Sequence, residues 1–147
     1  MDSQLASHLV DSMNAIEGEL DAVLVAASGC GHTMKAYGEI LQNSNGFRAP
    51  VLDVHEFLTN VGLSDSFSAQ LKPIAKAVAM HDACHMIHGQ GIQQQPRALL
   101  ANIPDLELKE PMEAGVCCGS AGIYNLVQPE EAAELGMIKA DDLSNTG

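Results

Sequence analysis

The sequence lacks tryptophan, has few aromatic and few basic residues, and contains no long apolar run. Aromatic residues make up only 3% of the 147 residues, so any core has to be built from aliphatic side chains and methionine. Lys and Arg total 7 against 19 Asp and Glu, which gives a formal net charge of −12. Because a surface of this charge repels nucleic acid and anionic membranes, we expect neither as a partner.

The absence of long apolar runs also excludes a transmembrane segment. The longest run, residues 22–27, is far shorter than the roughly 20 residues that a membrane-spanning helix needs. The N-terminus has no basic region followed by an apolar stretch, so no signal peptide is expected. Four cysteines without such a signal indicate a reducing, cytoplasmic compartment, where cysteines more often bind metal or react than form disulfides.

Apolar periodicity predicts an α/β fold with a mostly parallel sheet flanked by helices. The expected helices cover residues 4–20, 32–42, 51–61, 93–103 (with Pro96 in the first turn) and 129–143. Apolar runs predict strands at residues 21–27 and 74–81, the first of them buried, and a third, shorter strand is expected at residues 105–109. A further short strand is considered near Pro50, before the helix over residues 51–61. Residues 65–73 are expected to form a loop or a short helix. The length suits one domain.

All four cysteines lie in three expected turns, at residues 28–32, 82–85 and 116–122. Each turn follows a strand candidate, and functional groups in open α/β sheets gather beyond the carboxyl ends of strands. We therefore expect Cys30, Cys84 and the adjacent pair Cys117–Cys118 at one edge of the sheet. A disulfide within the adjacent pair would strain the ring that it closes, so the pair is not expected to bond to itself.

Thiolates are soft ligands that select zinc or iron–sulfur clusters over magnesium or calcium. The C-x₂-C spacing of most zinc sites is absent, whereas adjacent sulfurs can bind different irons of one cluster. Flanking glycines also let backbone N–H groups approach cluster sulfides. The residues alone leave four alternatives open: buried free cysteines, a redox dithiol, a zinc-stabilised interaction module, and a thiol-nucleophile enzyme built on Cys84 with His85 or His88.

Several residues beside the cysteines are further candidates. Next to the expected ligands lie His32, His85, His88 and Gly119. The two histidines after Cys84 suit ligation, proton transfer or hydrogen-bond donation, and a surface role is equally open. The other histidines, His8, His55 and His81, are expected to be structural or surface residues. Arg97 is either an anion contact or, as we prefer, a partner in a helix salt bridge.

The segments "HDACHMIHGQ" and Cys117-Cys118-Gly119, separated by thirty-odd residues, resemble the cysteine-rich CCG domain. This domain occurs in a subunit of heterodisulfide reductase, in the small subunit of anaerobic glycerol-3-phosphate dehydrogenase, and in lactate-utilisation proteins. The resemblance covers nearly the whole chain. The stretches "ASGCGHTMKAYGEIL" and "CCGSAGIYNLVQPE", together with "HGQ" after Cys84, are most similar to the glycolate oxidase iron–sulfur subunit.

The resemblance implies an iron–sulfur cluster, expected to be of the 4Fe–4S type, on Cys30, Cys84, Cys117 and Cys118. It further implies a partner subunit that carries FAD and oxidises glycolate or another 2-hydroxy acid. This chain would relay electrons toward quinone as an oxidoreductase subunit, inactive alone, with peripheral association at the inner face of the cell membrane through the complex. A thiol/disulfide reductase like heterodisulfide reductase is the alternative within the family.

The sequence departs from the family pattern in two places. The ferredoxin-like segment with C-x₂-C-x₂-C runs is not present, and the closing cysteine of the second repeat would fall just beyond Gly147. We therefore expect residues 1–147 to be a single CCG-type domain that is truncated, with Cys30 closing a first repeat and the other three cysteines belonging to a second. On this interpretation the chain lacks at least one ligand and loads its cluster incompletely.

Overall fold

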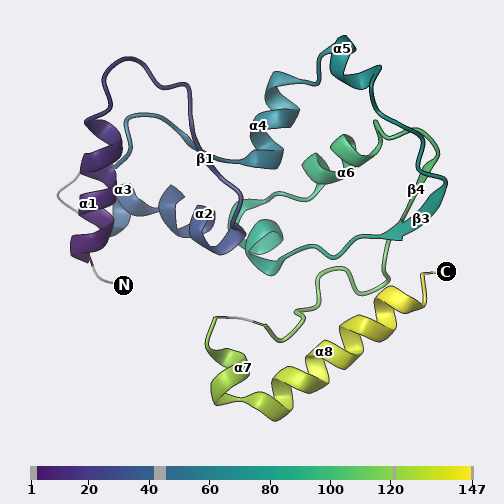
Figure 1. Cartoon of the computed structure of the whole chain (residues 1–147). Coiled ribbons are helices and arrows are strands. Elements are labelled where there is room, and N and C mark those ends of the chain that lie inside the picture. The colour runs from purple at the N-terminus through teal and green to yellow at the C-terminus, as the bar shows by residue number, and fades with distance from the viewer. Residues whose placement is uncertain (1–2, 42–45, 121, 147) are drawn as a thin grey trace. The chain divides into compact units, whose positions relative to one another are not determined.

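The computed structural model describes residues 3–41, 46–120 and 122–146 (Figure 1). Contacts divide the chain into two compact units, Met1–Val61 and Gly62–Gly147. Each unit contains one two-stranded parallel sheet with helices along the connection between its strands. The predicted α/β class and the parallel pairing are therefore confirmed. Within the described residues, the strands form two separate sheets, one per unit, where the sequence predicted one sheet.

The first unit begins with helix α1 and continues through a β-α-β arrangement. Its elements are α1 (Ser3–Asn14), β1 (Val23–Val25), α2 (Ser28–Lys35), α3 (Tyr37–Ile40), β2 (Val51–Asp53) and α4 (Val54–Val61). Strand β1 pairs with β2 in register Val23↔Val51. Val23 is buried, but Leu24 is 47% exposed, so the expected burial applies to one face of the strand only.

Helix α1 ends at Asn14, earlier than the predicted residue 20. Its periodicity is as expected, because Ala6 and Val10 are buried on one face. Beyond the helix, Gly18 adopts a φ of 93°, a left-handed conformation that cannot continue an α-helix. The Asn14 side chain binds the segment before β2 instead, because its amide donates to the carbonyl oxygen of Gly46 and its oxygen accepts the N–H of Arg48.

Two predicted boundaries near the sheet of the first unit are wrong. Residues 28–32 form the start of α2 where a tight turn was expected, and the N–H of Gly31 already donates to the carbonyl of Ala27 at 2.8 Å. The short strand considered near Pro50 is β2 at residues 51–53, so the helix begins three residues later than expected, because pairing with β1 holds these residues extended. The expected helix over residues 32–42 is split into α2 and α3 at Ala36, and residue 42 lies outside the described part of the chain.

The second unit carries the better-predicted elements. It contains α5 (Asp65–Ser68), β3 (Lys76–Ala79), the π-helix η1 (His85–Gly89), α6 (Gln94–Leu100), β4 (Leu106–Lys109), α7 (Tyr124–Val127) and α8 (Pro129–Ser144). Strands β3 and β4 pair in register Lys76↔Leu106 and lie side by side in Figure 1. The predicted strands, the short helix α5, and α6 with Pro96 in its first turn are confirmed. Helices η1 and α7 were not predicted.

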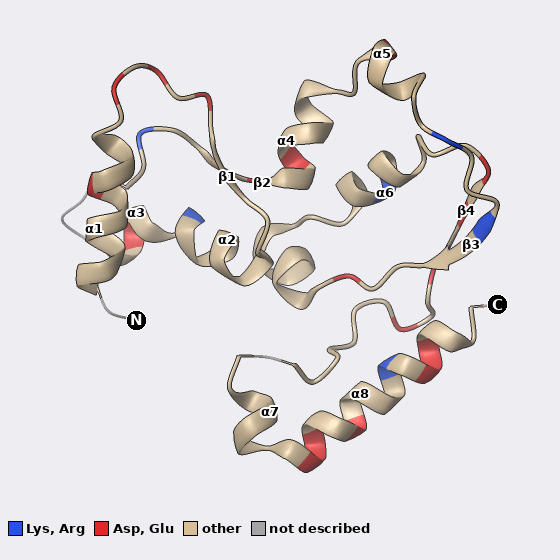
Figure 2. Ribbon diagram, in the orientation of Figure 1, with Lys and Arg blue, Asp and Glu red and all other residues tan. Residues whose placement is uncertain are grey.

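Few large side chains are fully buried in the described residues, and polar groups are buried beside them. The buried apolar residues are Ala6, Val10, Val23, Ala49, Ile92 and Ala132. Asp53, Asp82 and Lys139 are 1–3% exposed, and each has a charged or hydrogen-bonded partner. Acidic side chains recur along α8 and over both units in Figure 2. No described helix has the length and apolar composition required to cross a membrane.

Candidate metal centre

The structure places three of the four cysteines in two segments that leave the same sheet. Cys84 immediately precedes η1, a few residues after β3, and the Cys117–Cys118 pair follows β4 by a similar irregular segment. Because β3 and β4 are parallel, both segments leave the sheet at the same edge. Cys117 lies close enough to Cys84 to raise the pKa of the Cys84 thiol, and no cysteine is in a disulfide. Cys30 lies in the first turn of α2, in the other unit, and is exposed.

The environment of Cys84 favours its neutral thiol. Burial raises the pKa of the Cys84 thiol above its ordinary value, and the neighbouring Cys117 raises this pKa further by charge repulsion and hydrogen bonding. Backbone N–H groups of Cys84 and His85 oppose the shift, because they donate to the sulfur. A metal that binds here would therefore have to displace a proton from Cys84.

The turn that carries the cysteine pair depends on Gly119. Its backbone N–H donates to Sγ of Cys117 at 3.4 Å, and its φ is 80°. An added Cβ at this position would lie 2.2 Å from the carbonyl oxygen of Ala132 in α8. The turn therefore lies directly on the helix backbone, with room for glycine alone. Gly119, a candidate site residue, thus allows the turn to approach the backbone of α8, and its N–H also contacts the predicted ligand Cys117.

Helix α8 holds the segment before the cysteine pair at a second point. The buried ammonium group of Lys139 donates to the carbonyl of Glu113 and lies 3.5 Å from the carboxylate of Asp142. That carboxylate accepts the N–H of Glu113 at 3.1 and 3.2 Å. These contacts and the Gly119 contact bind the segment over residues 113–119 to helix α8. They therefore limit how far the thiols of Cys117 and Cys118 can move.

Arg97 of α6 joins the two cysteine-bearing segments. Its guanidinium donates twice to Asp82 (2.9 and 2.7 Å), twice to Glu110 (2.7 Å each) and once to the carbonyl of Gln93 (2.6 Å). All five N–H donors are therefore engaged, which is the full capacity of the group. The two carboxylates raise the pKa of Arg97, and Arg97 lowers the pKa of Glu110. We call this arrangement the Arg97 clasp. It confirms the salt-bridge interpretation and leaves no donor for an external anion.

The candidate histidines lie in different environments. His88 Nε2 lies 3.4 Å from the carbonyl oxygen of Gly115, so it connects η1 to the segment before the cysteine pair. His85 and His32 are exposed, in η1 and α2. His55 is not simply a surface residue, because its Nδ1 lies 2.7 Å from the buried carboxylate of Asp53. The sequence Asp-x-x-Glu at residues 53–56, a helix-capping pattern, is the signal that would have found this contact.

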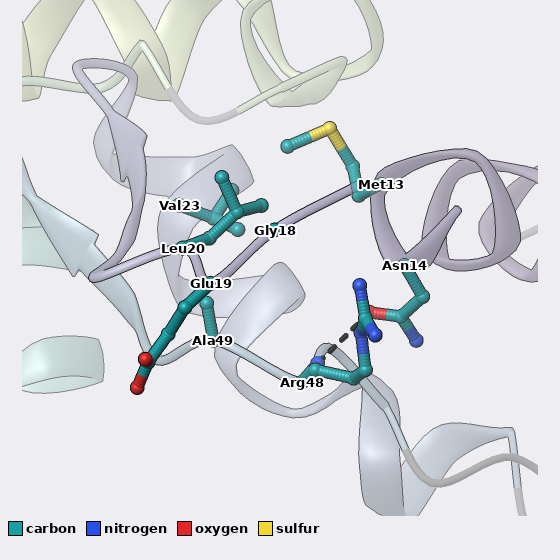
Figure 3. A pocket seen from close by; sticks show the side chains of 8 residues that line it. All are labelled: Met13, Asn14, Gly18, Glu19, Leu20, Val23, Arg48 and Ala49. Carbon is teal, nitrogen blue, oxygen red and sulfur yellow. Dashed lines mark hydrogen bonds between the residues drawn. The ribbon is translucent and has the colours of Figure 1, made fainter. Parts of the chain in front are cut away.

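One hollow of the first unit lies away from any cysteine side chain. It has a volume of about 470 Å³ and is shown in Figure 3. Arg48 borders it, with its backbone N–H on Asn14 Oδ1 and its Nη2 on the carbonyl of Ile16 at 3.0 Å. In Figure 3 the carboxylate of Glu19 points away from the guanidinium of Arg48. No thiol lines this hollow, so it is no part of the candidate metal centre.

The chemistry of the donor set fits a sulfur-ligated metal centre. Three thiols lie in the second unit, Cys117 raises the pKa of Cys84, and a backbone N–H donates to the sulfur of Cys117. Such N–H donors stabilise the charge of thiolate ligands. Over the ranges 3–41, 46–120 and 122–146, no three His, Cys, Asp or Glu side chains are arranged closely enough to hold a metal ion. The four-cysteine ligand set therefore stays a prediction.

With its thiols in turns at the ends of parallel strands, the second unit is a cysteine-rich α/β domain. Residues 78–147 match the family model of the CCG cysteine-rich domain. The resemblance drawn from the sequence is thereby confirmed. The family match falls entirely within the unit that contains Cys84 and the Cys117–Cys118 pair.

Three relatives illustrate the range of similar proteins. The chain is 38% identical to a fumarate reductase (CoM/CoB) subunit of Methanothermobacter marburgensis, over 86% of this chain and 24% of the relative. It is 30% identical to the probable glycolate oxidase iron–sulfur subunit of Bacillus subtilis, over 90% of this chain and 30% of the relative. It is 28% identical to a subunit of the dihydromethanophenazine:CoB–CoM heterodisulfide reductase of Methanosarcina barkeri, over 97% of this chain and 35% of the relative.

The chain thus spans about a quarter to a third of the length of these relatives. No solved structure matches the chain.

Proposed function

We propose that this chain is the cysteine-rich part of an iron–sulfur electron-transfer subunit in an oxidoreductase complex. The position of Cys84 and of the Cys117–Cys118 pair beyond the same edge of the parallel strands β3 and β4 is the observation that carries this proposal. Relatives named as iron–sulfur proteins and as oxidoreductase subunits support it. Cys84, Cys117 and Cys118, together with Cys30, would hold the cluster through their thiolates.

The residues around the thiols would serve the cluster in distinct ways. A bound iron–sulfur cluster, expected to be of the 4Fe–4S type, supplies one-electron transfer at a potential set by ligands, hydrogen bonds and exposure. The Gly119 N–H donates to Cys117 and stabilises the negative charge on that sulfur. The Arg97 clasp fixes the spacing of the two segments, and α8 holds the turn at Gly119.

In its finer form, the proposal is a flavin-linked glycolate or 2-hydroxy-acid dehydrogenase. A partner subunit would carry FAD and the substrate chemistry, and this chain would pass the electrons toward quinone. The similarity to the Bacillus subtilis glycolate oxidase subunit supports this form. The same form places the complex in the cytoplasm, with peripheral association at the inner face of the membrane.

A thiol/disulfide redox subunit is the second candidate. Two relatives favour it, since one is named a fumarate reductase (CoM/CoB) subunit and another a heterodisulfide reductase subunit, and the first is 38% identical. The two candidates differ in the molecule that reacts with the cluster, which is a disulfide in one and a flavoprotein partner in the other. Changes in visible absorbance when a disulfide is added to the reduced protein favour this candidate, whereas reduction by a flavoprotein partner favours the relay.

Anaerobic reconstitution tests the shared part of both candidates. The chain is incubated with iron and sulfide, and bound iron, labile sulfide and the EPR spectrum are measured. We expect iron and sulfide to bind together, and the Cys84→Ser and Cys117→Ser variants to lose most of both. Ser120→Ala is the matched control, because it changes the same turn without removing a sulfur. Binding of zinc without labile sulfide would instead support the zinc-stabilised interaction module.

A further inference from the structure

The hollow shown in Figure 3 combines an apolar floor with a positively charged rim. We propose that this hollow binds a small aliphatic carboxylate, with the carboxylate group at the guanidinium of Arg48 and the apolar body against Val23 and Ala49. All the lining residues belong to the first unit and none is a cysteine, so the proposal does not rest on the proposed function.

The floor and walls of the hollow are apolar. Val23 and Ala49 are each 6% exposed, and Met13 and Leu20 line the hollow beside them. The volume of about 470 Å³ lies within the range of roughly 300–1,000 Å³ that is usual for small-molecule sites. Because the side chain of Ala49 ends at Cβ, it leaves this space open, whereas a larger side chain would extend into it. Aliphatic groups that enter the hollow leave water, and their burial favours binding.

The guanidinium of Arg48 is held at the rim by the end of α1. The backbone N–H of Arg48 donates to Oδ1 of Asn14 at 2.9 Å, and its Nη2 donates to the carbonyl of Ile16 at 3.0 Å. Of the five N–H donors of the side chain, this carbonyl engages one among the described residues. The remaining donors suit a carboxylate, which a guanidinium binds through two parallel hydrogen bonds.

Arg48 has no acidic partner among the residues that the structure describes. The ion pairs there use Arg97, His55 and three lysines, although the chain has 19 acidic residues for 7 basic ones. Glu19 also lines the hollow, but Figure 3 shows its carboxylate directed away from the guanidinium. The two arginines of the chain therefore differ, because Arg97 uses all five donors within the protein and Arg48 keeps donors for a ligand.

The charge and the lining together define the class of ligand. A carboxylate can accept the donors of Arg48, whereas an ammonium group would be repelled by it. A single guanidinium in a chain of net charge −12 favours a monoanion over a more highly charged ligand. An aliphatic body covers Val23 and Ala49. Because Arg48 is exposed, its ion pair with the ligand contributes modestly, and we expect dissociation constants in the millimolar range.

NMR of the methionine methyl groups tests the proposal on the 147-residue chain. The chain is isotopically labelled at these methyl groups, the Met13 signal is assigned with Met13→Leu, and hexanoate, hexanol and hexylammonium are titrated in turn. We expect the Met13 signal to shift at millimolar hexanoate, and hexanoate to bind about three- to fivefold more tightly than the other two. An unchanged Met13 signal, or equal or tighter binding of hexylammonium, would overturn the proposal.

Two substitutions separate the charged rim from the apolar floor. Arg48→Gln should weaken hexanoate about three- to fivefold and leave hexanol unchanged, because only the carboxylate uses the guanidinium. Ala49→Leu should weaken both ligands, because its side chain takes their place. Lys72→Gln is the matched control, since it removes one exposed positive charge from the other unit and should leave hexanoate binding unchanged.

Circular dichroism verifies that each variant folds, and the three ligands compared on the wild-type chain decide the question if one does not. Equal weakening of hexanoate in Arg48→Gln and Lys72→Gln would show that net charge, and not Arg48, attracts the anion. Wild-type affinity in Ala49→Leu would show that hexanoate binds elsewhere. Either result would contradict the proposed site.

Discussion

Both units bury an aspartate where a strand ends, but they use it differently. Asp53 is the last residue of β2 and 1% exposed, and its carboxylate binds the backbone and ring of His55, two residues further on. Asp82 follows β3 and is 2% exposed, and its partner is Arg97, a helix away. Arg97 then continues to Glu110 after the next strand.

The difference shows what turns a buried charge into a link between loops. In the first unit the carboxylate of Asp53 helps to begin helix α4, and Glu56 completes the cap by accepting the N–H of Asp53. The contacts of the Asp53 carboxylate are with His55, two residues away, and the longer contact of this cap is the ion pair of Glu56 with Lys35 of α2. In the second unit the Arg97 clasp joins two segments that are distant in sequence, and those segments carry Cys84 and Cys117. Long-range pairing of the charge therefore positions the candidate metal centre.

Removing Arg97 should give the largest difference in stability between the two buried aspartates, Asp82 and Asp53. Arg97→Met leaves Asp82 buried without a partner, and breaking a buried ion pair in this way costs about 3–5 kcal/mol of unfolding free energy. Asp53→Ala removes a helix cap together with the local contact to the His55 ring and should cost about 1–2 kcal/mol. Urea unfolding followed by circular dichroism measures both. Equal losses in the two variants would mean that the clasp stabilises no more than a local cap does.

Gly119→Ala should have the next largest effect. The new Cβ would lie 2.2 Å from the carbonyl oxygen of Ala132, and residue 119 has a φ of 80°. Because the clashing atom belongs to the helix backbone, which cannot shift without disturbing the helix, we expect the unfolding free energy to fall by about 2–3 kcal/mol. Gly62→Ala is the matched control, because Gly62 has φ of 79° with nothing within 4 Å of the added atom. It should lose only the conformational part, about 1 kcal/mol. Thermal unfolding compares the two, and similar losses would show that contact with α8 contributes nothing.

Acid should weaken the clasp by a smaller amount through Glu110. Arg97 holds the pKa of Glu110 below its ordinary value of 4.5 in the folded chain, so this carboxylate stabilises the fold at higher pH. The contribution is present above the unfolded pKa and is lost as the pH falls through the lowered, folded pKa. Urea midpoints from about pH 6 to about pH 3 should therefore decline less steeply in Glu110→Gln than in the wild type.

Glu107→Gln is the control for this measurement, because Glu107 is exposed on β4 and pairs only with Lys109 in the described contacts. Its pH dependence should match that of the wild type. A slope in Glu110→Gln as steep as the wild-type slope would mean that Glu110 contributes nothing to acid sensitivity.

The sequence predicted the elements whose signals are local. The apolar runs before Asp82 and Lys109 located β3 and β4, and the acidic stretch after Pro129 located α8. The same reasoning placed Cys84 and the Cys117–Cys118 pair beyond the ends of two parallel strands. Short-range preferences were sufficient for these predictions, because strand length, helix period and chain connectivity together define a parallel pair.

What the sequence could not supply depends on contacts between distant residues. Nothing near Arg97 in the sequence indicates that its partners are Asp82 and Glu110, since bidentate pairing is set by the fold. The close approach of Gly119 to Ala132 is equally invisible, because a glycine in a turn has many possible causes. The start of α2 at Ser28 was missed because the glycines around Cys30 favour a turn, and packing of α2 on the sheet overrides that preference.

The contact of Gly119 with α8 involves the main chain of Ala132 and not its side chain. Replacement of that alanine's methyl group therefore leaves the steric requirement intact, whereas unwinding of the helix at this point would remove it. The ordering of the cysteine pair is thus coupled to the integrity of the N-terminal turns of α8, and fraying from Pro129 onward would loosen the thiols before any residue of the turn itself had changed.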